Sequence, residues 1–96
     1  MFTHVVLFKL KDNSKENMNK VRDLLLSMEG KIEEIRGLTV GEDVLFTKRS
    51  YDLCLIVTFL NQEEMDKYQV HGYHVGTVLK NLKPMLESST VCDFVS

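Results

Sequence analysis

The stretch YDLCLIVTFL, residues 51–60, is the clearest predicted strand in this sequence of 96 residues. A strand with one solvated face is polar at every second position, whereas this stretch is apolar on both faces. The stretch FTHVVLFKL at residues 2–10 has the same character. These two strands are therefore predicted to lie in a sheet that is covered on both sides.

The segments around these strands repeat one pattern of strand, helix and strand. A first helix is predicted after the possible caps Asp12, Asn13 and Ser14, with Asn13–Glu16 as a capping pattern, and it ends at Gly30 or at the latest at Gly37. Asn61 with Glu64 repeats the capping pattern in the second half. The further predicted elements are a strand at 38–46, a helix at 62–70, a helical stretch at 75–82 after a break at Gly72, and a strand at 89–95.

This order of elements predicts an α+β, ferredoxin-like βαββαβ fold, with residues 1–96 as a single domain. Both helices are expected on one face of a four-stranded antiparallel sheet. The other face is also apolar and needs a partner. The simplest partner is a second copy of the same sheet, which predicts a two-fold homodimer with the sheets face to face, through the face bearing Val5, Leu7, Cys54 and Ile56.

The charge balance and the length of the apolar runs argue against two classes of partner, nucleic acids and membranes. Lys and Arg number 12 and Asp and Glu number 14, for a net charge of −2, whereas nucleic-acid binding needs clustered positive charge. The longest apolar run, residues 53–57, is far shorter than the roughly 20 residues that span a bilayer. The first residues do not resemble a secretory signal. We expect a cytoplasmic protein that binds neither nucleic acid nor membrane.

The cysteines and histidines do not form a recognisable metal motif. Cys54 and Cys92 lie in apolar stretches outside any C-x-x-C pair, which predicts reduced, buried side chains that act as small hydrophobes. His71 and His74 are spaced for one helix face, but no carboxylate or fourth ligand accompanies them and His4 at ligand spacing. Neither a metal nor a cofactor is predicted.

Four segments of the chain resemble, in order, elements of the stress-responsive dimeric α/β-barrel (Dabb) family. The last of them is similar to the family signature Y-x-x-H-P-x-H, with Gly72 in place of its proline. The resemblance implies a ferredoxin-like monomer and a dimeric barrel. The four segments are HVVLFKL at 4–10, VGED at 40–43, YDLCLIVTF at 51–59 and YQVHGYHV at 68–75.

Some members of this family are plant polyketide cyclases of the olivetolic acid type, which close a linear polyketide by an intramolecular aldol step. The resemblance implies acid–base roles for His74 and Tyr68 and a pocket-lining role for His4. Phe94 stands where the cyclase-type relatives have a tyrosine, and this difference counts against the same activity.

The candidate site rests on His74. Its imidazole can accept a proton at neutral pH, and Tyr68 could bond that imidazole or a substrate carbonyl. Alternatively, His74 has a structural role and only connects the helix break to the sheet or to the dimer partner. His4 is either a buried histidine with one partner or a ligand-lining residue. The expected ligand pocket consists of His4, Val6, Phe8, Leu55 and His71.

Three functions remain open at this point. The first is a homodimeric Dabb protein that binds a small hydrophobic ligand in an apolar cavity, with its specific activity undefined. The second is a cofactor-free enzyme of polyketide-cyclase or monooxygenase type that uses Tyr68 and His74 as an acid–base pair. The third is a purely structural stress protein. A cavity faced by both side chains favours the first two functions, and a filled interior favours the third.

Overall fold

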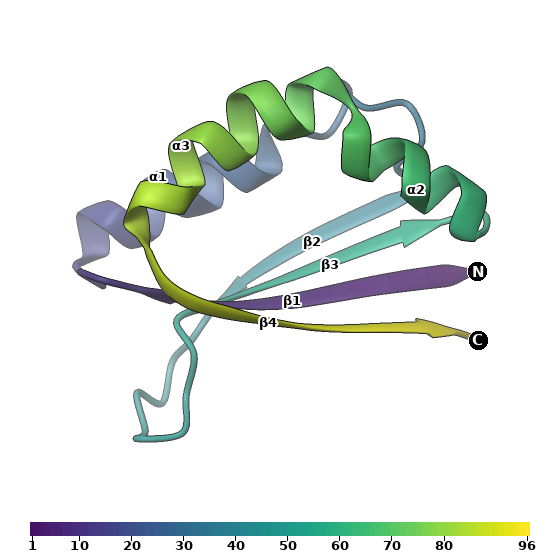
Figure 1. The fold of residues 1–96 in the computed structure, drawn as a ribbon. Coiled ribbons are helices and arrows are strands. Elements are labelled where there is room, and N and C mark those ends of the chain that lie inside the picture. The colour runs from purple at the N-terminus through teal and green to yellow at the C-terminus, as the bar shows by residue number, and fades with distance from the viewer.

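A single antiparallel sheet carries all the helical elements on one of its faces (Figure 1). The computed structural model describes all 96 residues, and the predicted ferredoxin-like order of elements is confirmed. The sheet has the order β2-β3-β1-β4 and consists of β1 (Phe2–Leu10), β2 (Gly37–Glu42), β3 (Leu53–Phe59) and β4 (Leu86–Val95). The helical elements are α1 (Lys15–Leu26), α2 (Gln62–Val70), the π-helix η1 (His74–Leu79), α3 (Lys80–Leu82) and the 3₁₀-helix η2 (Lys83–Met85).

The core lies between the helices and one face of the two central strands. In antiparallel strands, directly opposite residues share a face, and the register pairs Val6 with Leu55 and Phe8 with Leu53. Burying side chains of this size contributes about 1.5–3 kcal/mol each. The buried members of this face are Phe2, His4, Val6, Phe8, Leu10, Leu53, Leu55, Val57 and Phe59.

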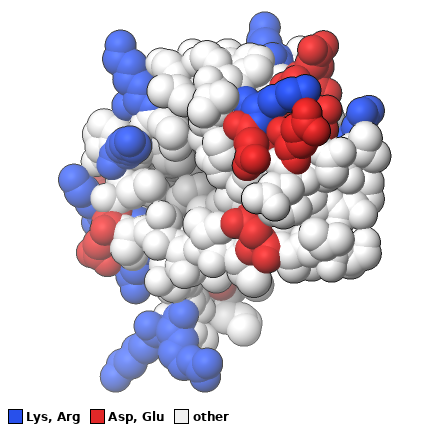
Figure 2. Space-filling view, turned by 45° about the vertical axis from the view of Figure 1, so that its right-hand side comes forward, with Lys and Arg blue, Asp and Glu red and all other residues white.

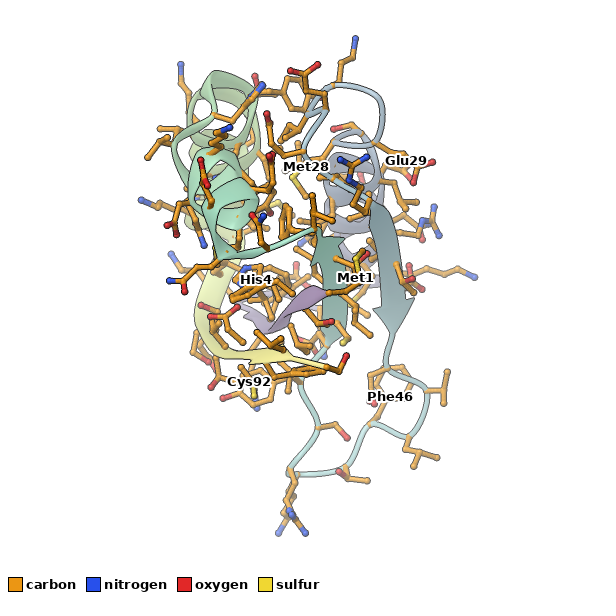
Figure 3. The ribbon with its side chains drawn as sticks, turned by 90° about the vertical axis from the view of Figure 1, so that its right-hand side faces the viewer. Met1, His4, Met28, Glu29, Phe46 and Cys92 are labelled. Atoms are coloured by element: carbon orange, nitrogen blue, oxygen red, sulfur yellow. The ribbon has the colours of Figure 1, made fainter.

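The opposite face of the sheet is not covered by any helix. Val5 lies opposite both Ile56 and Cys92, and Leu7 lies opposite Cys54, so all five side chains share this open face. Figure 3 shows Cys92 on the side of the sheet away from the helices. The prediction that both cysteines are buried is wrong for the single chain, because Cys54 is half-buried and Cys92 is exposed on this face.

Helix α1 ends earlier than predicted. Of the three possible caps, Ser14 caps the helix by accepting a hydrogen bond from the Asn17 backbone N–H at 3.3 Å. The helix ends at Leu26, before both predicted stops, because the Ser27 hydroxyl donates to the Leu24 carbonyl at 2.6 Å and the backbone tightens into turns. Gly30 takes the left-handed conformation there, with φ of 82°. The apolar stripe continues through these turns, where Met28 and Ile32 are buried.

The link between β2 and β3 is longer than the sequence indicates. Strand β2 ends at Glu42 instead of residue 46, and residues 43–52 form a loop that hangs on the side of the sheet opposite the helices (Figure 1). The Phe46 N–H donates to the Asp43 carboxylate at 2.7 Å, and Phe46 adopts a positive φ of 51°. This turn interrupts the predicted strand and leaves Val44, Leu45 and Phe46 exposed.

A break in the second helical region positions the next segment over the sheet. Helix α2 has the predicted bounds, and Asn61 caps it by accepting from the Glu64 N–H at 3.0 Å. The break falls at His71, whose backbone is extended, one residue before the predicted Gly72. The chain then enters a π-helix, a rare form that often occurs at functional sites.

The last strand, β4, begins at Leu86 instead of residue 89 because it pairs with the end of β1.

The face of the molecule drawn in Figure 2 carries charges of both signs. Figure 2 shows acidic and basic side chains scattered around broad uncharged areas. None of the helices combines the length and apolar composition that a bilayer-spanning segment needs.

Candidate functional site

A cavity of about 330 Å³ lies between the helix-covered face of the sheet and the second helical region. Most of its wall is apolar, with Val6, Phe8 and Leu55 from the sheet and Leu25 from α1. Three of its polar side chains, those of His4, Tyr68 and His74, are buried. The exposed residues of its lining are Gln69, Lys83, Ser89 and Val91, and the last two lie on the edge strand β4. The cavity is therefore apolar, has polar groups in its interior and opens beside β4.

Of the residues expected around a pocket, the structure brings six to this cavity and leaves out one. His4, Val6, Phe8, Leu55, Tyr68 and His74 all line it. His71 does not, because its Nδ1 accepts a hydrogen bond from the Tyr73 N–H at 3.1 Å and so stays at the helix break. The expectation that His71 lines the pocket is wrong for this reason.

His74 is held as a neutral imidazole with one nitrogen available. Its Nδ1 lies 3.2 Å from the carbonyl oxygen of Gln69, and a carbonyl only accepts, so Nδ1 carries the proton. Nε2 then keeps its lone pair in the neutral ring. Burial lowers the pKa of His74; the Gln69 hydrogen bond opposes this shift, and nearby His4 and His71 add to it. His74 is therefore a base that remains unprotonated at neutral pH.

His4 forms a dyad with Asp93. The two residues lie opposite each other on β1 and β4, and His4 Nδ1 is 2.5 Å from the Asp93 carboxylate. The carboxylate fixes the ring and favours a proton on Nδ1, which leaves Nε2 as the free nitrogen. Figure 3 shows His4 between the sheet and the helices. Asp93 was not among the predicted residues; the sequence signal was its acidic side chain in a strand between Val91 and Val95, but only the strand register reveals its partner.

Tyr68 contacts His74 through its ring and not through its hydroxyl. The ring centroids of Tyr68 and His74 are 4.4 Å apart, and those of Tyr68 and Phe59 are 5.0 Å apart. The Tyr68 hydroxyl donates to the Met28 sulfur at 3.6 Å and not to the imidazole, which was one of its two possible partners. Burial raises the pKa of Tyr68 far above its ordinary value. Tyr68 thus acts as a hydrogen-bond donor and not as a base.

Together these groups present an apolar wall, a hydrogen-bond donor and imidazole nitrogens to one space. Two imidazoles and a protonated phenol lie in one apolar space. No group of three His, Cys, Asp or Glu side chains is placed to hold a metal ion.

The sequence profile of the stress responsive A/B barrel domain (Dabb) family matches residues 2–96. The chain belongs to this family. The predicted resemblance is therefore confirmed over nearly the whole sequence. No curated protein matches this Dabb chain.

Several solved structures share the fold of this Dabb protein. A dimeric ferredoxin-like protein of unknown function from Bacteroides fragilis is 27% identical, with a TM-score of 0.83 over 99% of this chain and 95% of the other. A protein from Arabidopsis thaliana is 23% identical, with a TM-score of 0.87 over 100% and 95%. Hydroxynitrile lyase from Passiflora edulis is 13% identical, with a TM-score of 0.85 over 99% and 92%. The fold is thus shared by proteins of unknown function and by an enzyme.

Proposed function

We propose that this Dabb protein binds a small, mostly apolar molecule in the cavity between its sheet and its second helical region. The observation that supports this most strongly is the cavity of about 330 Å³ whose wall is mainly apolar and whose interior holds the buried His4, Tyr68 and His74. A mainly apolar space with a few convergent polar groups is the usual form of a small-molecule site. A purely structural protein would not need such a space.

The test uses a neutral probe and a pair of variants on one strand. Octan-1-ol is titrated into ¹⁵N-labelled protein, and amide shifts are expected to change around the cavity. Val91 lines the cavity and is half-exposed, so Val91→Trp can block the opening without disturbing the core. Val95 is exposed on the same strand outside the cavity, so Val95→Trp is the matched control. Shifts that persist in Val91→Trp would refute binding at this place.

A second candidate function is cofactor-free proton transfer, and the tautomers of the two histidines favour it. Both Nδ1 atoms are occupied, by the Gln69 carbonyl and the Asp93 carboxylate, so Nε2 is the ring nitrogen without a partner in each histidine. Sulfur is a weak acceptor, so the Tyr68 hydroxyl can move from Met28 to a substrate carbonyl. Such a set could remove an acidic proton next to a carbonyl and hold the resulting oxygen.

The test for this second function is proton exchange in a bound carbonyl compound. Deuterium loss from carbon next to the carbonyl of octan-2-one should be faster with protein than without, and His74→Gln should abolish most of the difference. Asp93→Ala should reduce it as well if the oriented His4 takes part. An exchange rate that is the same in wild type and His74→Gln would rule out His74 as the base.

We further propose that the chain forms a homodimer through its open sheet face, as several relatives with this fold are described as dimeric. That face carries Val5, Leu7 and Ile56, which no element of the chain covers. The loop at residues 43–52 hangs on the same side and exposes three large apolar side chains (Figure 1). An apolar surface of this kind is typical of an interface.

A further inference from the structure

Lys83 is the only Lys, Arg, Asp or Glu residue in the lining of the cavity. Apart from the two histidines, which are held neutral by burial or paired with Asp93, the other lining residues are apolar or uncharged. Lys83 is exposed and forms no ion pair with any acidic side chain. Its ammonium group is therefore free to meet an anion at the cavity.

Lys83 and the imidazoles lie at different ends of the cavity wall. On the helical side, His74 begins the π-helix η1, and Lys83 comes after α3, at the start of η2. On the sheet side, the wall from His4 to Phe8 covers about 13 Å along β1, and Phe8 is paired with Ser89 of β4 near the start of that strand. A charged group at Lys83 is thus separated from His4 and His74 by a stretch of apolar wall that includes Val6, Phe8 and Leu82.

We infer that the ligand is an apolar organic acid of medium chain length, whose carboxylate pairs with Lys83 and whose carbon chain extends toward His4 and His74. This inference rests on the proposed binding function and names the chemical class of its ligand. The interior holds no cation that would receive a carboxylate, since His74 is neutral and His4 already bonds a carboxylate. The acid therefore enters with its chain first and keeps its charged end in contact with water at Lys83.

The experiment compares octanoate with octan-1-ol, which have the same chain length and differ in charge. Dissociation constants for both are measured by calorimetry on wild type, Lys83→Met and Lys80→Met. Methionine keeps the length of the apolar stem and removes the charge. Lys80 is exposed on the same helical run but does not line the cavity, so it is the matched control.

The expected result is that Lys83→Met weakens octanoate binding about two- to five-fold, the range for a solvent-exposed ion pair, and leaves octan-1-ol unchanged. Lys80→Met should change neither ligand, and the effect of Lys83→Met should shrink at high salt. If both ligands bind and Lys83→Met affects them equally, the inference is overturned while the cavity function stands. If neither ligand binds wild type, the proposed binding function itself fails.

Discussion

His4 and Asp93 form a part-buried histidine–carboxylate pair although they are 89 positions apart in the sequence. The pair exists because β1 and β4 are neighbours in the sheet and the register sets these two residues directly opposite each other. The Asp93 side chain is about one-third exposed at the edge strand, whereas His4 is buried against the cavity. An edge-strand carboxylate thus orients an imidazole inside the cavity.

Removal of the Asp93 carboxylate should change the protonated nitrogen of His4. In wild type the ring ¹⁵N shifts of His4 should show a protonated Nδ1, because Nδ1 faces the carboxylate. Asp93→Ala should lose this preference while the fold is retained. Asp66→Ala, at an exposed position on α2, serves as control and should leave the His4 shifts unchanged. Identical His4 shifts in wild type and Asp93→Ala would contradict the dyad.

His74 should make stability depend on pH below neutrality. Burial lowers its pKa in the folded chain, so the unfolded chain binds more protons as the pH falls below about 6.5. The free energy of unfolding should therefore be highest, as far as His74 affects it, above that pH. It should decrease as the pH falls toward the lowered pKa of His74. His74→Gln should show a weaker decrease in urea titrations across the same range. Parallel curves for wild type and variant would refute the shift.

Tyr68→Phe should leave the fold intact. The substitution removes only a hydrogen bond to sulfur, which is a weak acceptor, and keeps the ring against His74 and Phe59. The expected loss in free energy of unfolding is about 1 kcal/mol or less. Tyr68→Ala removes the buried ring and should cost about 3–5 kcal/mol. Equal losses in the two variants, measured by chemical denaturation, would show that the hydroxyl and not the ring stabilises this site.

Asp52→Ala should destabilise the chain without any change in the cavity. The buried Asp52 carboxylate accepts the Leu10 N–H at 2.8 Å and the Asn13 side-chain amide at 3.1 Å, which connects the end of β1 to the start of β3. Without it the Leu10 N–H has no partner, at a cost of about 1–3 kcal/mol. The exposed Asp66→Ala variant is the control in thermal unfolding, and an equal effect of both variants would contradict this role.

Leu7→Asp should separate the proposed dimer. Leu7 lies on the open sheet face, and a second copy there would bury the new carboxylate without a partner, which is strongly unfavourable. Sedimentation is expected to give a dimer for wild type and a monomer for the variant. Val70→Asp, at an exposed position on α2, should stay dimeric. A wild type that sediments as a monomer at micromolar concentration would refute the dimer outright.

Local sequence pattern accounts for much of the fold. The alternation in β1 and β3 predicts two apolar faces, and the structure has one face under helices and one uncovered. Asn61 and its capping pattern predict the start of α2 correctly, because a cap depends on residues adjacent in the chain. Helix α1 and strand β2 end earlier than predicted, since the Ser27 hydroxyl and the Asp43 carboxylate stabilise turns that apolar periodicity does not reveal.

The sequence predicts some residues of the candidate site but not the contacts between them. His74 and Tyr68 are near each other in the chain and carry a recognisable signature, so the sequence by itself determined them as candidates. The family resemblance added His4, and Val6, Phe8 and Leu55 lie in the same apolar strands. The tertiary structure alone decided that Asp93 pairs with His4, that Tyr68 bonds Met28 instead of an imidazole, and that His71 turns away. The physical reason is that periodicity and capping act between near neighbours, whereas the register of β4 on β1 and the packing of α2 against the turns after α1 join residues far apart in the chain.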